Sequence, residues 1–249
     1  MQLRFPFPTT RKDTFANLIV DERNAHTASI CKTFATGEDV SVKSLVVYGA
    51  AGSGKTHLLC AMGDMAAKDA GEEASLYLDG AALVEAVESA ATYEELKGRI
   101  QNFESAFFLA VDNLDIIEGN NAAEDQVFHL YNAVVQSGGR FAAAVAKPPV
   151  DWKFQDHLST RLLWGHALAV NPVGDGKRVS VLIKVAADLG VKLPENVAQW
   201  LLTRLSRDPK EQIAAIEAID RHSLTTGKKV SISLVREALG QPPEMDGSI

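Results

Sequence analysis

A glycine-rich run at residues 49–56 constrains the fold of this chain more than any other feature of the sequence. It reads Gly-Ala-Ala-Gly-Ser-Gly-Lys-Thr and matches the pattern G-x-x-x-x-G-K-[ST] in full. Glycines let consecutive backbone N–H groups turn towards phosphate oxygens, because a Cβ would obstruct them, and the helix that follows points its positive end at the same anion. The run therefore predicts a phosphate-binding loop between a buried strand and a helix.

The segments on either side of the loop have the patterns that it requires. Residues 44–48 form a short, continuously apolar run, which is typical of a strand buried on both faces. After the loop, apolar residues recur at helical spacing and stop at Gly71. Similar patterns predict strands at 75–78, 106–111, 141–146 and 167–170, and helices that end near Gly37 or cover 92–100 and 125–135. This alternation indicates an α/β fold, a parallel sheet sandwiched by helices.

The strand pattern disappears after Pro172. Helical patterns follow at 177–189, 194–205, 209–224 and 233–239. We expect the chain to divide near residue 172 into an α/β base, residues 13–171, and a small all-α domain, residues 172–240. Residues 1–12 contain two prolines and are predicted to run extended, and residues 241–249 to form a loose tail.

The composition predicts a soluble globular protein with a net negative charge, which leaves room for a local basic patch. The formal net charge is −7 at pH 7, the wrong sign for a protein held mainly by nucleic-acid phosphates, so we expect no strong direct DNA binding. The absence of a long apolar stretch and of a signal-peptide pattern predicts a cytoplasmic protein with no membrane contact. Cys31 and Cys60 lack metal-ligand spacing and are expected to be buried.

Three side chains have the chemistry that a phosphate site needs. Lys55 would neutralise charge on the β- and γ-phosphates, and the Thr56 hydroxyl would ligate Mg²⁺. Asp112 follows the apolar run 107–111, so it would lie at the carboxyl end of a strand and face the ligand crevice. Thr56 and Asp112 are therefore the predicted metal contacts. The alternative interpretation of Asp112 is a surface acid in a turn.

Five segments of the chain resemble, in order, the AAA+ domain of the bacterial replication initiator DnaA. They are residues 14–20 ahead of Asn24, the loop continuing into His57-Leu58-Leu59, residues 158–162 with Trp164-Gly165, the helix at 177–187, and residues 230–239. The resemblance covers about residues 14–240 and implies an AAA+ P-loop NTPase-like base with a helical lid. DnaA carries a helix-turn-helix domain after its lid, whereas this chain ends ten residues after Leu239. It is therefore most similar to the shorter Hda-type regulators, which inactivate DnaA by promoting hydrolysis of its ATP.

The resemblance implies a site for an adenine nucleotide, ADP or ATP with Mg²⁺. The nucleotide-binding residues that it implies are Gly49, Gly52, Ser53, Gly54, Lys55, Thr56, His57, Asp112 and Lys210. Arg161 matches the arginine that reaches the γ-phosphate of a neighbouring subunit, an arginine finger in trans. The alternative interpretation of Arg161 is a structural salt bridge or a helix cap. His157 falls where DnaA has another arginine, and no role is assigned to it.

The N-terminal peptide Gln2-Leu3-Arg4-Phe5-Pro6-Phe7 is similar to the Q-L-x-L-P-L peptide by which Hda-type proteins hold the DNA polymerase III sliding clamp. Gln2 would anchor by hydrogen bonds, while Leu3, Phe5 and Phe7 would fill an apolar groove. Phenylalanine stands at two positions where leucine is usual. The alternative is an edge strand that packs on its own domain. The implied partners are thus the sliding clamp and DnaA, at the nucleoid or replisome; a homodimer stays open.

Three departures from the family pattern predict weak or absent intrinsic ATPase activity. Asn113 follows Asp112 and cannot serve as a base. The end of the fourth strand, Ala144-Val145-Ala146, offers no hydroxyl or carboxylate, and Lys147 after it offers only charge. Lys210 stands where the lid has an arginine, and Arg207 is a candidate substitute.

Two alternatives to an Hda-like regulator remain open. One is a self-sufficient AAA+ ATPase such as a DnaC-like helicase loader, and the other is a DnaA paralogue with another regulatory role. Elsewhere in the chain we expect structural residues only. Trp152, Trp164 and Trp200 are predicted to be packing residues. Asp115 is predicted to be a solvated loop acid, with a supporting role behind Asp112 as the alternative.

Overall fold

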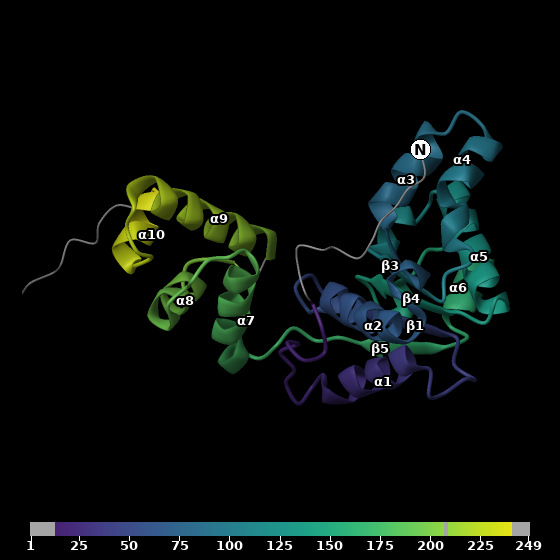
Figure 1. Cartoon of the computed structure of the whole chain (residues 1–249), viewed down its shortest axis with the longest axis horizontal. Coiled ribbons are helices and arrows are strands. Elements are labelled where there is room, and N and C mark those ends of the chain that lie inside the picture. Colours follow the sequence, from purple (N-terminus) through teal and green to yellow (C-terminus); the bar gives the residue numbers. More distant parts are fainter. Residues whose placement is uncertain (1–12, 207–208, 241–249) are drawn as a thin grey trace, which may run out of the picture. The chain divides into compact units, whose positions relative to one another are not determined.

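Five parallel strands lie at the centre of the first of the two units into which the chain divides (Figure 1). The structure is a computed structural model, and it describes residues 13–206 and 209–240. The strands are β1 (Ser44–Tyr48), β2 (Ser75–Asp79), β3 (Phe108–Asp112), β4 (Arg140–Val145) and β5 (His166–Ala169). They are hydrogen-bonded in the order β2-β3-β4-β1-β5, and every pairing is parallel. The prediction of a parallel sheet is confirmed.

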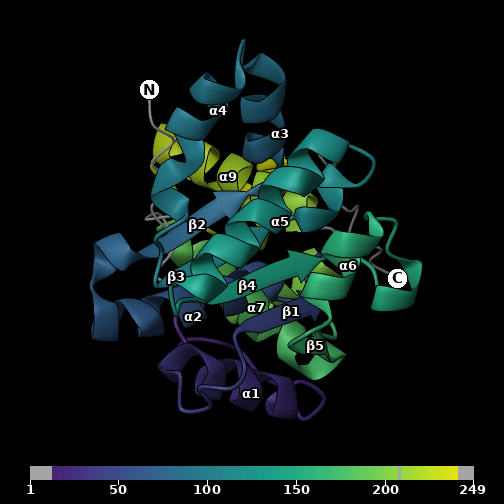
Figure 2. The ribbon, with the colours of Figure 1, turned by 90° about the vertical axis from the view of Figure 1, so that its right-hand side faces the viewer.

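Helices cover both faces of this sheet (Figure 2). The helices α1 (Ala25–Thr36) and α2 (Lys55–Ala70) pack on one face. The opposite face is covered by α3 (Gly80–Ser89), α4 (Tyr93–Ile100), α5 (Asn121–Gln136) and α6 (Asp156–Leu162). Short 3-10 helices occur at η1 (Glu72–Ala74), η2 (Gln101–Phe103), η3 (Leu114–Ile117) and η4 (Pro149–Asp151).

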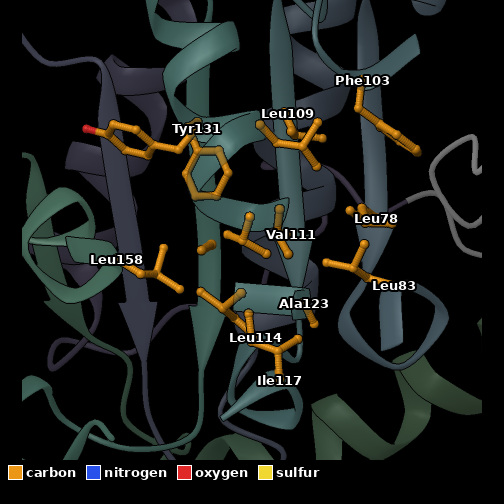
Figure 3. Packing of buried hydrophobic residues seen from close by; sticks show 14 of the residues in the cluster. Leu78, Leu83, Phe103, Leu109, Val111, Leu114, Ile117, Ala123, Tyr131 and Leu158 are labelled. Carbon is orange, nitrogen blue, oxygen red and sulfur yellow. The ribbon is translucent and has the colours of Figure 1, made fainter. Parts of the chain in front are cut away.

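The larger hydrophobic cluster lies between the sheet and helices α3 to α6 (Figure 3). Leu109 and Val111 of β3 point into it, and Leu83 of α3 and Leu158 of α6 belong to the same cluster. The intervening residue of β3, Ala110, belongs to the cluster on the opposite face. Side chains alternate between the faces of a strand, so a strand covered on both sides is apolar at every position. This is why the strands appear in the sequence as continuous apolar runs.

Both cysteines lie in the cluster formed by α1, α2 and the sheet. Cys31 and Cys60 are both buried, as predicted. Burial raises the pKa of Cys31 to about 12, because a thiolate is poorly solvated there. Cys31 is therefore a neutral packing residue at physiological pH.

Two helices of the first unit, α3 and α6, are absent from the sequence prediction. Asp79, the last residue of β2, is the N-cap of α3 and accepts a hydrogen bond from the backbone N–H of Ala81 at 2.9 Å. Strand and helix therefore share a boundary with no loop between them. A sequence interpretation that expects turn residues between elements misses such a junction.

The second unit, from Val173 onwards, is helical in the part that the structure describes. Its helices are α7 (Asp175–Asp188), α8 (Glu195–Leu202), α9 (Pro209–Thr226) and α10 (Ile232–Ala238). They enclose a separate core that includes Leu182, Val197, Leu201, Ile216 and Leu234. The predicted small all-α domain is confirmed. Within the described residues, no helix combines the length and the apolar character that crossing a bilayer would require.

Candidate functional site

The glycine-rich loop connects the end of β1 to the start of α2, at the carboxyl edge of the sheet. β1 lies between β4 and β5, and the residue after β5, Val170, donates a backbone hydrogen bond to the carbonyl of Tyr48 at 2.7 Å. A Cβ on Gly49 would lie only 2.1 Å from the carbonyl oxygen of Val170. Gly52 and Gly54 adopt φ values of 73° and 103°. Close approach and left-handed backbone therefore explain why these three positions are glycine.

Lys55, the first residue of α2, is held over the loop that precedes it. Its Nζ donates to the carbonyl oxygens of Gly49 at 2.7 Å and Ala50 at 3.1 Å. Desolvation lowers the pKa of Lys55, while the charges of Asp112 and Asp115 act in the opposite direction. An anion bound nearby would stabilise the charged form of Lys55, which burial destabilises.

The Ser53 hydroxyl is a second sign that the loop accommodates an anion. Its oxygen is buried and has no hydrogen-bond partner within the described residues. A Cβ on Gly54 would meet nothing within 4 Å, so the loop leaves open space there. Buried hydroxyls normally have partners. An oxygen-rich ligand in the loop would supply one.

Asp112 is the buried acid of the site, with 1% of its surface exposed. Its Oδ2 accepts hydrogen bonds from the Thr56 hydroxyl at 2.6 Å and from the Tyr77 hydroxyl at 2.8 Å. Its Oδ1 accepts from the backbone N–H of Asn113 at 2.9 Å. Burial, followed by the charge of Asp112, raises the pKa of Tyr77 well above its usual range. Asp112 is therefore firmly oriented, and it is not the surface acid of the alternative interpretation.

This arrangement fits a divalent cation that arrives with a phosphate ligand. The Thr56 hydroxyl donates a hydrogen bond to Asp112, so the lone pairs of the Thr56 oxygen remain available for a metal. Oxygen atoms of this kind are what Mg²⁺ prefers. Across the described residues, no group of three His, Cys, Asp or Glu side chains could hold a metal by itself. A cation here would need further ligands from the nucleotide or from water.

The three positions that depart from the catalytic pattern of the family at the ends of β3 and β4, Asn113, Ala146 and Lys147, make structural contacts. Asn113 has a φ of 52°, and its side-chain amide donates to Asp79 at 2.7 Å. The backbone N–H of Ala146, just after β4, donates to Asp115 at 2.8 Å. Lys147 pairs with Glu118 at 2.8 Å, which raises the pKa of Lys147. Asp115, predicted to be a solvated loop acid, is half-buried, and its carboxylate also ties η3 to the end of β4.

His57 lies next to Thr56 but contacts the segment ahead of α1. Its Nδ1 is 3.2 Å from the Asp13 carboxylate and its Nε2 is 3.0 Å from the Thr14 carbonyl oxygen. Lys210 belongs to α9, but its side chain lies outside what the structure describes, as does Arg207. The peptide residues Gln2, Leu3, Phe5 and Phe7 also lie outside the described residues.

Arg161 occupies the last turn of α6, away from any carboxylate partner in the described structure. Its Cζ lies 3.8 Å from the ring centroid of Trp164 and 5.7 Å from that of Phe128. Its Nε is buried without a hydrogen-bond partner. We call these three residues, Arg161, Phe128 and Trp164, the Arg161 cluster. The salt bridge and helix cap considered for Arg161 are absent from the described structure.

The start of α6 is fixed by a buried carboxylate. Glu124 of α5, 1% exposed, accepts from the backbone N–H of Gln155 at 2.6 Å and of Gly119 at 2.8 Å. Gln155 is the N-cap residue of α6. Glu124 therefore helps to hold the helix that presents Arg161.

Several of these contacts were missed in the sequence. Tyr77 is a hydroxyl-bearing residue within an apolar strand that ends beside Asp112, and this position could have predicted its contact with the site. Phe128 gave no signal, because it lies in a helix far from Arg161 in sequence. The prediction for Trp164 is wrong: 67% of it is exposed, and its ring stacks on Arg161 instead of filling the core.

Comparison with known families assigns both units. The chain matches the model of the bacterial DnaA ATPase domain over residues 9–169. It matches the model of the Hda lid domain over residues 175–239.

Solved structures share the fold across most of the chain. Domain III of the replication initiation protein DnaA from Thermotoga maritima is 22% identical with a TM-score of 0.75, covering 92% of this chain and 96% of that chain. DnaA from Aquifex aeolicus bound to AMPPCP is 24% identical with a TM-score of 0.64, covering 84% and 65%. The Holliday junction branch migration motor RuvB of Thermotoga maritima is 12% identical with a TM-score of 0.60, covering 93% and 72%. The AAA+ fold is therefore confirmed. Because the DnaA ATPase model matches the base and the Hda lid model matches the helical unit, the chain belongs to the DnaA-related AAA+ family and is Hda-like.

Proposed function

We propose that this chain is an adenine-nucleotide-binding regulator of chromosome replication initiation, which promotes hydrolysis of DnaA-bound ATP by supplying Arg161 in trans. The observation that carries the proposal is the state of Arg161. Its guanidinium is stacked on aromatic rings and has no anionic partner in the described structure, on a base that matches the DnaA ATPase domain. A cation so placed suits the developing charge on a phosphoryl group of another protein.

The nucleotide of this chain itself is proposed to be ADP or ATP. Gly49, Gly52 and Gly54 shape the loop, and Lys55 and Ser53 supply a charge and a hydroxyl that lack an anionic partner. Two DnaA structures of similar fold contain AMPPCP, an adenine nucleotide analogue. Mg²⁺ bound with the nucleotide would neutralise phosphate charge, with Thr56 as its ligand and Asp112 holding Thr56 in place. Isothermal titration with ADP, ATP and GTP tests this, and equal affinity for GTP would contradict an adenine site.

Intrinsic hydrolysis is proposed to be weak or absent. Asn113 has no carboxylate to activate water, and the end of β4 presents no free polar side chain, since Lys147 is paired with Glu118. Nucleotide would then act as a ligand that stabilises the folded chain. Steady-state ATP turnover by the purified chain is the test. Turnover at the rate of an ordinary AAA+ motor would favour the self-sufficient ATPase instead.

The decisive experiment measures hydrolysis of ATP bound to DnaA. Arg161→Ala should abolish stimulation while leaving nucleotide binding and unfolding unchanged, because Arg161 contacts neither the phosphate loop nor a buried carboxylate. Arg221→Ala, on the exposed side of α9, is the matched control and should stimulate normally. Full stimulation by Arg161→Ala would remove the arginine-finger role.

Docking on the sliding clamp is proposed to depend on Gln2, Leu3, Phe5 and Phe7. The support is the similarity of residues 2–7 to a clamp-binding peptide. Removing residues 1–8 should abolish capture of the clamp in a pull-down, and Arg4→Ala, between the proposed anchors, should not. If the clamp is still captured after the deletion, residues 1–8 do not bind it and this proposal is wrong.

A further inference from the structure

The position of Trp164 is not explained by core packing. It follows α6, and 67% of its surface is exposed. A tryptophan combines a large apolar ring with a polar N–H, and such residues are enriched where a specific contact is made. The contact in this structure is the guanidinium of Arg161, at 3.8 Å from the ring centroid. This distance is well inside the range of a favourable cation–π interaction.

The backbone fixes Trp164 in this position. Its N–H donates to the carbonyl oxygen of Arg161 at 3.2 Å, which closes the turn after the helix. The next residue, Gly165, passes so close to β1 that a Cβ there would lie 1.8 Å from the carbonyl oxygen of Ser44. The turn that carries the indole ring is therefore anchored to β1. The backbone position of Trp164 does not depend on the Arg161 side chain.

The remaining surroundings of Arg161 keep its charge available. Phe128 of α5 lies 5.7 Å from the guanidinium and also makes an edge contact with His157, one turn earlier on α6. Asp125 of α5 pairs with His157 at 3.3 Å. Arg161 is thus oriented by rings and left without a carboxylate in the described structure. Rings can orient a guanidinium without neutralising it, whereas a carboxylate would do both.

We infer that Trp164, assisted by Phe128, is a positioning residue that holds the Arg161 guanidinium in the orientation in which it meets the phosphoryl group of the partner's nucleotide. The inference rests on the proposed function, since it assigns Trp164 to the same reaction. A flexible arginine loses rotamer freedom when it engages a transition state, and an arginine already stacked loses less. The benefit should therefore appear in the rate of the stimulated reaction and not in the affinity of the two proteins.

The test compares Trp164→Leu and Trp164→Phe in the full chain, with Arg161→Ala as the reference. Trp164→Leu should lower the maximal rate of stimulated hydrolysis of DnaA-bound ATP by about 10-fold. The concentration of the chain that gives half-maximal stimulation should not change. Trp164→Phe retains a ring and should recover most of the rate. Because the side chain is exposed, both variants should unfold at the same urea concentration as the wild type.

A second readout does not depend on DnaA. The Nε–H of Arg161 lies near the indole ring, so its proton resonance should be shifted by the ring current. The signal is assigned by its loss in Arg161→Ala. It should move towards the value of an exposed arginine in Trp164→Leu and remain shifted in Trp164→Phe.

Each outcome separates the inference from the proposed function. If Arg161→Ala loses stimulation while Trp164→Leu keeps it, the inference is overturned and the proposed function stands. If Trp164→Leu changes only the half-maximal concentration, the ring contacts the partner instead of positioning Arg161, and the inference is again overturned. If Arg161→Ala stimulates normally, the proposed function fails and the inference with it.

Discussion

The phosphate loop and the Arg161 cluster are charged regions of the same unit, and they are built in opposite ways. In the loop region each charged side chain has polar contacts: Lys55 with two carbonyl oxygens, Asp112 with three donors. In the Arg161 cluster the charge lies against aromatic rings and no acid neutralises it in the described structure. The first arrangement suits a site that receives a ligand into a formed network. The second suits a group whose counter-ion comes from another molecule.

The difference also appears in how the two regions are supported. The loop is fixed by backbone packing, with Gly49 against the carbonyl of Val170. The Arg161 cluster is supported by a buried carboxylate, Glu124, which holds the start of α6. Removing a charge from the loop should therefore affect ligand binding, and disturbing its backbone should affect stability, whereas damage around α6 should affect stability and the presentation of Arg161 without changing ligand binding. Four substitutions test this contrast.

The largest effect is expected for Lys55→Ala. The variant loses the cation at the phosphates, and we expect the affinity for ADP and ATP to fall about 100-fold, or roughly 3 kcal/mol. Lys147→Ala is the matched control, because the charge of Lys147 is already paired with Glu118. Isothermal titration measures both. Equal losses in the two variants would mean that the loop is not the nucleotide site.

Gly49→Ala should come next. The added Cβ would lie 2.1 Å from the carbonyl oxygen of Val170, so strand β5 or the loop must shift. We expect a loss of about 2 to 3 kcal/mol in the free energy of unfolding. Gly98→Ala in α4, where a Cβ meets nothing within 4 Å, should instead be neutral or stabilise the chain slightly. Urea unfolding gives both values, and a Gly49→Ala protein as stable as Gly98→Ala would contradict the tight packing.

Glu124→Gln tests the support of the Arg161 cluster. An amide oxygen can replace one acceptor, but its NH₂ group would face the second backbone N–H. We expect a loss of about 2 kcal/mol in the free energy of unfolding, with nucleotide affinity unchanged. Glu88→Gln, exposed on α3, is the control. A fall in nucleotide affinity without a change in stability would show that the two regions are not separable in this way.

The smallest effect is expected for Tyr77→Phe, which removes one donor from Asp112. We expect a loss of about 1 kcal/mol in unfolding free energy, and none for Tyr93→Phe, whose side chain is exposed. Folding raises the pKa of Tyr77 above the usual 10, so its contribution is full below pH 10. It should decline as the pH rises above that value, because the unfolded chain ionises first. Urea unfolding at pH 8 and near pH 11 measures the difference.

Much of the fold could be predicted from the sequence because β1, β3 and β4 are covered on both faces and are therefore short, almost continuously apolar runs. The glycine loop identifies the strand that precedes it. Helix α3 was missed because Asp79 ends a strand and caps a helix at once. The sheet order also requires contacts that no local pattern contains, such as β5 beside β1.

The residues of the candidate site divide in the same way. Thr56 and Asp112 are recognisable because each stands at a fixed place relative to a strand, and the parallel sheet brings them together. Phe128 and Trp164 were not recognisable as partners of Arg161, since one comes from another helix and the other resembles any core aromatic. The roles of Phe128 and Trp164 depend on contacts between elements, and the hydrophobic periodicity of one sequence does not reveal such contacts.

The contact between His57 and the segment ahead of α1 has a mechanical consequence. Both ring nitrogens of His57 reach Asp13 and Thr14, while the neighbouring residue, Thr56, holds Asp112. Tension applied to the chain before Asp13 would therefore reach the first turn of α2 in part through this imidazole ring. In a molecule tethered and pulled at its N-terminus, part of the force would therefore act on His57, the residue next to the phosphate loop.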